Sequence, residues 1–238
     1  MSPGRPDIHR RSRGAEIEPP VARAGRLALT GLALVMLSGA AGAFTATLTP
    51  LAPKTIYLQI GNGTFTGGNY TPTNFLGQPS GSPGNNTTIN TVSVSVPAAS
   101  VGNGAAQAMT TNSTASNSFW DGYAFCNLPA QLYIGGFYRT TGNGNGTISV
   151  IATVPASLTD GAGDSIPFSQ ISWTSSGNGD GTTAQPFPAG SFSGPSINVG
   201  GFAQNTWDES CWTFSFANST VPAAGTYTGV VLYTLTAP

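Results

Sequence analysis

The sequence predicts an all-β protein built from antiparallel strands. After the first 43 of its 238 residues, short segments alternate apolar and polar side chains with a period of two, as in a strand that buries one face. Gly, Asn, Asp, Ser and Pro residues separate these segments and favour turns between them. No part of this region has the periodicity of an amphipathic helix. Eight or more short strands of this kind predict an antiparallel β-sandwich of the immunoglobulin-like or Greek-key type.

The predicted strands follow one another with turn-rich segments between them. They cover residues 55–60, 91–96, 131–139, 147–154, 166–173, 196–202, 211–216 and 226–236. Val92, Val94 and Val96 share one face of their strand, and the apolar residues from Ile148 to Val154 share one face of theirs. These faces are expected to lie in the core.

Three strands carry irregular features. Gly135 and Gly136 lie in the middle of strand 131–139 and predict either a bulge or a close approach of another backbone. The alternation in strand 166–173 shifts near Gln170, which a bulge would explain. Strand 226–236 is apolar on both faces in its middle, which predicts a position inside a sheet rather than at an edge.

The chain after residue 43 is expected to form a single domain, residues 44–238. The segment 61–88 is rich in Gly, Asn and Pro, so we expect a long loop or a loose hairpin there, held to the body by Tyr70, Phe75 and Leu76. The alternating segment 44–49 is either a first strand of this domain or a donor strand that completes a neighbour's sheet.

The N-terminal segment predicts export. Six of the eight Lys and Arg residues lie among the first 26 residues, an apolar stretch follows, and Ala41-Gly42-Ala43 ends it. This is the pattern of a secretory signal peptide covering residues 1–43. We expect a secreted, periplasmic or cell-surface protein with no membrane span once the signal is removed.

Removal of this segment would leave few groups that catalyse reactions. The remaining 195 residues contain Lys54, Arg139 and no histidine, against six carboxylates, for a net charge of −4. The lack of a basic patch disfavours nucleic acid as a partner, and the lack of an imidazole disfavours Ser-His-Asp, Cys-His and zinc hydrolases. We therefore expect a protein that is not an enzyme.

One class of enzyme does not need histidine. Glycosidases use a pair of carboxyl groups, and Asp121, Asp208 and Glu209 each lie near a Trp and a Cys in the sequence. Alternatively, Asp121 begins a turn with Gly122, and Asp208 and Glu209 end a loop before a strand. We favour these structural roles over catalysis for the three carboxylates.

The two cysteines, Cys126 and Cys211, predict one disulfide, because paired cysteines are typical of exported proteins. A bridge that closes a loop of about 86 residues stabilises the fold by about 4 kcal/mol in the chain-entropy model. We expect it to join two strands across the sandwich.

Two kinds of ligand site are conceivable from the residues. Trp120, Trp207 and Trp212 are candidates for stacking against surface glycans, although large aromatic side chains are more often part of the core. Asp160 and Asp164 alternate with glycines, which suits calcium, a possible cofactor, but is equally typical of a tight turn.

The segment Gly-Thr-Tyr-Thr-Gly-Val-Val-Leu-Tyr-Thr-Leu at 225–235 resembles the closing strand of secreted bacterial coat and fimbria-like β-sandwich proteins, including the spore coat U type. Segments 119–126 and 166–180 resemble exported proteins of Gram-negative bacteria that have no assigned function. The first resemblance implies a structural or adhesive cell-surface protein that self-associates. A carbohydrate-binding module is the alternative, and a glycosidase-like enzyme comes third.

Overall fold

The computed structural model describes residues 45–48, 54–68, 70, 81–140, 146–178 and 184–236, all within one compact unit (Gly39–Pro238). The predicted signal peptide and the predicted anchors Phe75 and Leu76 lie outside the described residues.

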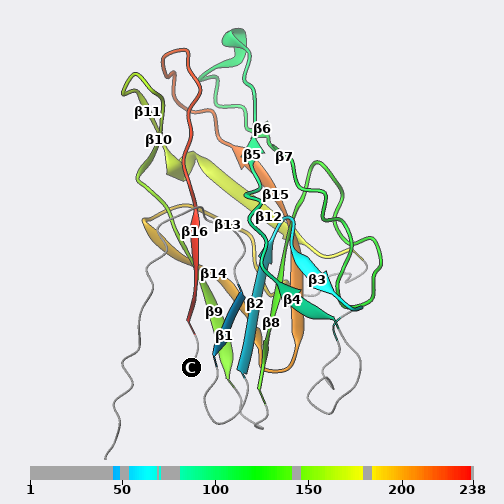
Figure 1. Cartoon of the computed structure of the whole chain (residues 1–238). Helices are drawn as coiled ribbons and strands as arrows, with labels where there is room; N and C mark the ends of the chain where they lie inside the picture. The colour runs from blue at the N-terminus through cyan, green and yellow to red at the C-terminus, as the bar shows by residue number, and fades with distance from the viewer. Residues whose placement is uncertain are drawn as a thin grey trace, which may run out of the picture. The chain divides into compact units, whose positions relative to one another are not determined.

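Nearly all regular structure in the described ranges is β (Figure 1). The strands are β1 (Thr45–Leu48), β2 (Lys54–Ile60), β3 (Thr64–Thr66), β4 (Ser82–Gly84), β5 (Val92–Ser93), β6 (Gln107–Ala108), β7 (Thr110–Thr111), β8 (Leu132–Arg139), β9 (Thr147–Thr153), β10 (Ser157–Thr159), β11 (Ser165–Pro167), β12 (Ile171–Ser176), β13 (Gly190–Ser191), β14 (Ser196–Ala203), β15 (Trp207–Phe216) and β16 (Leu232–Thr236). Two short 3₁₀ helices, η2 (Ala98–Ser100) and η3 (Phe168–Gln170), interrupt them.

Two antiparallel sheets form the sandwich. The larger, seven-stranded sheet has the order β1-β2-β8-β15-β12-β13, with β6 also paired to β15. The smaller sheet has the order β14-β9-β16. The chain passes repeatedly between the sheets, because β8, β12 and β15 belong to the larger one and β9, β14 and β16 to the smaller one. The predicted antiparallel β-sandwich is therefore confirmed.

The main core lies between the two sheets. Ile148, Val150 and Ala152 of β9 are wholly buried, and they belong to the same apolar cluster as Ile134 of β8 and Trp212 of β15. The predicted inward face of 147–154 is thus confirmed. Burial of apolar surface from both sheets makes the largest favourable contribution to the stability of the sandwich.

A second aromatic cluster covers the other face of the larger sheet. Tyr57 of β2, Tyr133 and Phe137 of β8, and Trp207 of β15 all contribute to it. Segments that belong to neither sheet of the sandwich pack over these rings, and Phe65 of β3 is one of the residues involved. Because both of its faces are covered, every residue of β8 is buried.

The two glycines of β8 allow close packing and do not form a bulge. The register of β8 is regular against both β2 and β15. A Cβ on Gly136 would lie 2.3 Å from the carbonyl oxygen of Tyr57 and 2.9 Å from a ring carbon of Phe202. Of the two predicted alternatives, the close approach is the one observed.

The remaining sequence predictions are met in part. The break near Gln170 is present, but as the 3₁₀ helix η3 between β11 and β12. The predicted strand 91–96 is reduced to β5, although Val92, Val94 and Val96 are half-buried on the core as expected. Within 61–88, β3 and β4 form a hairpin, and Tyr70 is buried as predicted.

The prediction for the last strand was wrong. The strand β16 is shorter than expected and pairs with β9 alone, so it is an edge strand of the smaller sheet. Val231, Tyr233 and Leu235 pack on the core, whereas Val230 and Leu232 are 62% and 53% exposed. The apolar residues on the second face meet solvent, because no other described element covers them.

At the other end of the chain, β1 pairs antiparallel with β2 of the same molecule. Within the segment 44–49, the described residues Thr45–Leu48 thus contribute a strand to the sheet of their own molecule. In the described part of the chain, no helix is long and apolar enough to span a membrane.

Candidate functional site

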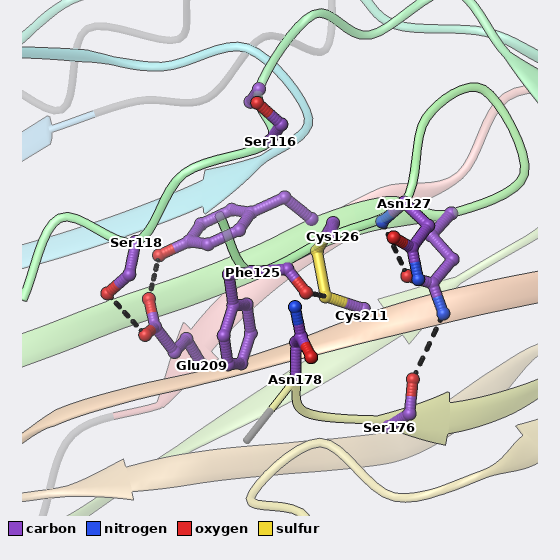
Figure 2. Close-up of a disulfide and its surroundings, with 12 residues drawn as sticks. Ser116, Ser118, Phe125, Cys126, Asn127, Ser176, Asn178, Glu209 and Cys211 are labelled. Carbon is purple, nitrogen blue, oxygen red and sulfur yellow. Dashed lines mark hydrogen bonds between the residues drawn. A yellow bond between two sulfur atoms is a disulfide. The ribbon is translucent and has the colours of Figure 1, made fainter. Parts of the chain in front are cut away.

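The disulfide joins a loop to a strand on the outer face of the larger sheet. Cys211 lies in β15, whereas Cys126 lies in an irregular segment after the loop formed by residues 117–124, here called the Trp120 loop. Figure 2 shows the bond between the two residues above β15. The predicted pairing is present, but the predicted bridge across the sandwich is not: the disulfide fixes a covering loop to one sheet.

A carboxylate next to the disulfide holds the same loop. Glu209 lies two residues before Cys211, so its side chain is on the same face of β15. One carboxylate oxygen accepts a hydrogen bond from the hydroxyl of Ser118, at the start of the Trp120 loop (Figure 2). The other accepts one from the hydroxyl of Tyr133. The indole N–H of Trp207 also donates to Glu209, at 2.8 Å. Three donors from separate parts of the chain therefore converge on one carboxylate.

Burial shifts the proton affinities of these groups. Burial raises the pKa of Glu209 above its ordinary value, even though its three hydrogen bonds act in the opposite direction. Burial also raises the pKa of the Tyr133 hydroxyl, and the charge of Glu209 adds to this rise. The hydroxyl of Tyr133 therefore remains a hydrogen-bond donor at neutral pH.

The raised pKa of Glu209 leads to a prediction about stability. Native Glu209 binds a proton more tightly than the unfolded chain does, so its contribution to the free energy of unfolding falls as the pH rises from 4.5 through the raised pKa. The side chain of Glu209→Gln cannot ionise, so this variant lacks the pH-dependent contribution to the free energy of unfolding. In urea unfolding at pH 4 and pH 7, we expect the wild type to lose stability relative to Glu209→Gln at the higher pH. An equal difference at both values would contradict a raised pKa.

The structure separates the three candidate tryptophans. Trp212 is wholly buried between the sheets, and Trp207 is buried in the second aromatic cluster. Neither ring has a face open to solvent, so the expectation of ligand stacking on them is corrected. Trp120 is 49% exposed and keeps its place as a candidate.

Trp120 rests on buried aromatic side chains. Its ring centroid lies 5.8 Å from that of Tyr70, which is itself buried and lies 5.0 Å from Phe137. The guanidinium carbon of Arg139 is 5.0 Å from the centre of the Tyr70 ring, a distance suited to a cation–π contact. The exposed indole is thus supported from below by the second aromatic cluster.

The acidic residues 160 and 164 form a turn. They follow β10 and precede β11, and the Asp160 carboxylate accepts hydrogen bonds from the backbone N–H groups of Ala162 and Asp164. The sequence suited either calcium binding or a tight turn, and these hydrogen bonds form the tight turn. Among the described residues, no group of three or more His, Cys, Asp or Glu side chains comes together. Calcium binding by Asp160 and Asp164 stays a prediction.

The three carboxylates considered for glycoside hydrolysis have different environments. Asp208 and Glu209 are adjacent in β15 and point to opposite faces of the sheet. The Asp208 carboxylate accepts the backbone N–H of Ala203, and the exposed Asp121 carboxylate accepts that of Tyr123 within the Trp120 loop. The Asp121 contact matches the turn expected from the sequence, whereas Asp208 and Glu209 lie within β15 and not in a loop before a strand, because β15 begins at Trp207.

A second candidate surface lies at the free edge of β16. One side of this strand pairs with β9 from Leu232 to Thr236, and no described strand pairs with the other side. From residue 225 to residue 236 the sequence contains no charged residue and no proline. Edge strands usually carry such residues, because they prevent pairing with other chains.

Sequence reasoning missed the partners of Glu209. Ser118 and Tyr133 lie 91 and 76 residues from Glu209 in the chain. The alternation along β15 was the available signal, because it places Trp207, Glu209 and Cys211 on one face. No pattern in the sequence indicated which loop would lie over that face. Comparisons of the chain with protein-family models, with curated protein sequences and with solved structures found no match.

Proposed function

We propose that this chain is an exported structural or adhesive protein of the cell surface, which associates with further copies of itself through the edge of β16. The observation that carries the proposal is the free, uncharged edge of β16, with Val230 and Leu232 exposed beside it. The same segment carries the resemblance to coat and fimbria-like proteins.

The chemistry of the edge favours a second strand as its partner. Along an antiparallel edge strand, alternate residues direct their backbone N–H and C=O groups away from the sheet. A second strand would pair with these groups, and its side chains would cover Val230 and Leu232. Two β16 edges have the same composition and no charges to repel one another.

Export is supported by a separate set of observations. The N-terminal pattern predicts a signal peptide, and the one disulfide is typical of oxidising compartments outside the cytosol. A disulfide-linked fold also suits a structural protein outside the cell, where the bond persists.

Association through β16 is tested by Leu232→Lys. In sedimentation velocity across a concentration series, we expect the wild type to form dimers or larger assemblies. A lysine on the edge opposes pairing, so the concentration for half-assembly should rise about tenfold or more, which equals about 1.4 kcal/mol.

The matched control is Thr174→Lys, which adds the same charge at an exposed position of β12, a strand with neighbours on both sides. It should assemble as the wild type does. A wild type that stays monomeric at all concentrations, or equal assembly of the two lysine variants, would exclude this function for β16. Pairing of two β16 edges gives a closed dimer, whereas pairing of β16 with β1 of the next copy gives open fibres.

A further inference from the structure

We propose that the Trp120 loop is a recognition site for neutral carbohydrate, separate from the β16 edge. Its two large aromatic side chains, Trp120 and Tyr123, are 49% and 76% exposed. The other three tryptophans, Trp173, Trp207 and Trp212, are buried. A Trp on a loop that presents its ring to solvent has a solvation cost, which a ligand that covers the ring would remove.

The loop is held in one conformation by many contacts. The backbone N–H of Trp120 donates to the Ser118 hydroxyl at 3.0 Å, and that hydroxyl donates to Glu209. Residues Asn117 and Ala124 form a β-bridge, and Gly122 takes a positive φ of 81° at the turn between them. The disulfide at Cys126 fixes the segment that follows. A ligand would therefore bind without first having to order the loop.

The carboxylate beneath the loop supports a binding role for Trp120. Partly burying the Glu209 carboxylate has a desolvation cost, which is why its pKa is raised. An apolar side chain on this face of β15 would cover the sheet without that cost. The Glu209 carboxylate accepts the Ser118 hydroxyl, and this hydroxyl in turn fixes the backbone that presents the Trp120 ring.

The charges near the loop indicate the class of ligand. Asp121 at its tip is exposed, and Arg139, whose guanidinium lies against the Tyr70 ring, is buried. Anionic ligands such as phosphates and acidic sugars are therefore disfavoured. Neutral sugars fit, because their C–H faces lie flat against an aromatic ring while their hydroxyl groups donate to carboxylates.

Donors for sugar oxygens are present as well. The side-chain amides of Asn117 and Asn178 each use one N–H to hold the loop, donating to the carbonyls of Gly122 and Ala124. Each amide carries a second N–H, and both side chains are exposed. Together with the Asp121 carboxylate, they supply donors and acceptors around the ring. Fixed aromatic rings with a few polar groups beside them are what sugar recognition requires.

The test begins with the purified protein on an array of neutral oligosaccharides with gluco, manno and galacto configurations. We expect retention on at least one of them. The best-bound oligosaccharide is then titrated in solution, followed by tryptophan fluorescence. Trp120→Ala should weaken binding about tenfold or more, and Trp120→Tyr, which keeps a ring, should weaken it less.

Two further variants separate the roles of the residues. Ser118→Ala leaves the Trp120 ring but removes its support from Glu209, so binding should weaken without being lost. Leu232→Lys, on the β16 edge, should bind as the wild type does. Thermal unfolding of each variant shows whether it is folded.

Three results would overturn the proposal. They are no retention of the wild type on any neutral oligosaccharide, equal binding by the wild type and a folded Trp120→Ala variant, and a Trp120-dependent response to tetramethylammonium without any response to the oligosaccharides. The last would identify a site for organic cations held by cation–π contacts.

Discussion

Trp212→Ala is expected to lower the free energy of unfolding by about 4 kcal/mol, the largest effect of a single substitution considered for this chain. Trp212 is wholly buried between the sheets. Its ring lies 5.1 Å from that of Trp173 and 5.9 Å from that of Phe214, and it also contacts Tyr233 of β16 at 6.4 Å. Removing the indole would leave a cavity that both sheets line, and β-sheets cannot collapse far into such a space.

The hydrogen bond of Trp212 adds a smaller part to this effect. The indole N–H donates to the carbonyl oxygen of Phe187 at 3.0 Å, and the same oxygen accepts a hydrogen bond from Ser175 at 2.6 Å. Because the carbonyl keeps Ser175 as a partner, the loss in Trp212→Ala comes chiefly from packing.

Trp120→Ala is the matched control, since it removes the same side chain from a half-exposed position. It should change the free energy of unfolding by about 0.5 kcal/mol or a little more. Urea unfolding monitored by far-ultraviolet circular dichroism measures both variants. Losses of similar size in the two would contradict the central place of Trp212 in the core.

Removal of the disulfide is expected to produce the second large effect. The double variant Cys126→Ala, Cys211→Ala opens a loop in which the cysteines are 85 residues apart. The chain-entropy model predicts a loss of about 4 kcal/mol in the free energy of unfolding. Both cysteines are buried, so alanine is a better replacement than serine, which would bring an unpaired hydroxyl into the cluster.

The place of the disulfide predicts which part of the fold responds. The bond holds the segment after the Trp120 loop against β15, whereas the core between the sheets does not include either cysteine. In the double variant, hydrogen exchange should increase first in residues 113–126 and over the second aromatic cluster. Uniformly faster exchange in β9 and β14 instead would indicate that the bond stabilises the whole sandwich equally.

Local patterns determined the fold class and much of the core. In β9 the alternation of apolar and polar residues was sufficient to identify Ile148, Val150 and Ala152 as buried, because side chains on a strand alternate between faces whatever the strand packs against. The pairing of Cys126 with Cys211 was also predictable, because the chain offers no other partner for either residue.

The position of β16 shows where such patterns fail. Apolar residues on both faces of a strand indicate that both faces could be covered, but only the arrangement of the sheets decides whether they are. The strand pairs with β9 alone, so Leu232 remains exposed although the sequence predicts that it is buried. An open edge is a property of the assembled sheets, and this is why it is visible only in the tertiary structure.

The sequence by itself determined that this chain forms an antiparallel β-sandwich with one disulfide, because strand period and cysteine number are local or countable properties. The tertiary structure alone decided that the disulfide and Glu209 both act on the Trp120 loop, and that Trp120 is exposed while Trp207 and Trp212 are buried. The reason is physical: burial and hydrogen bonding between residues 91 positions apart depend on which loop covers which face of a sheet. That choice results from the packing of the whole domain and is not encoded in any single segment.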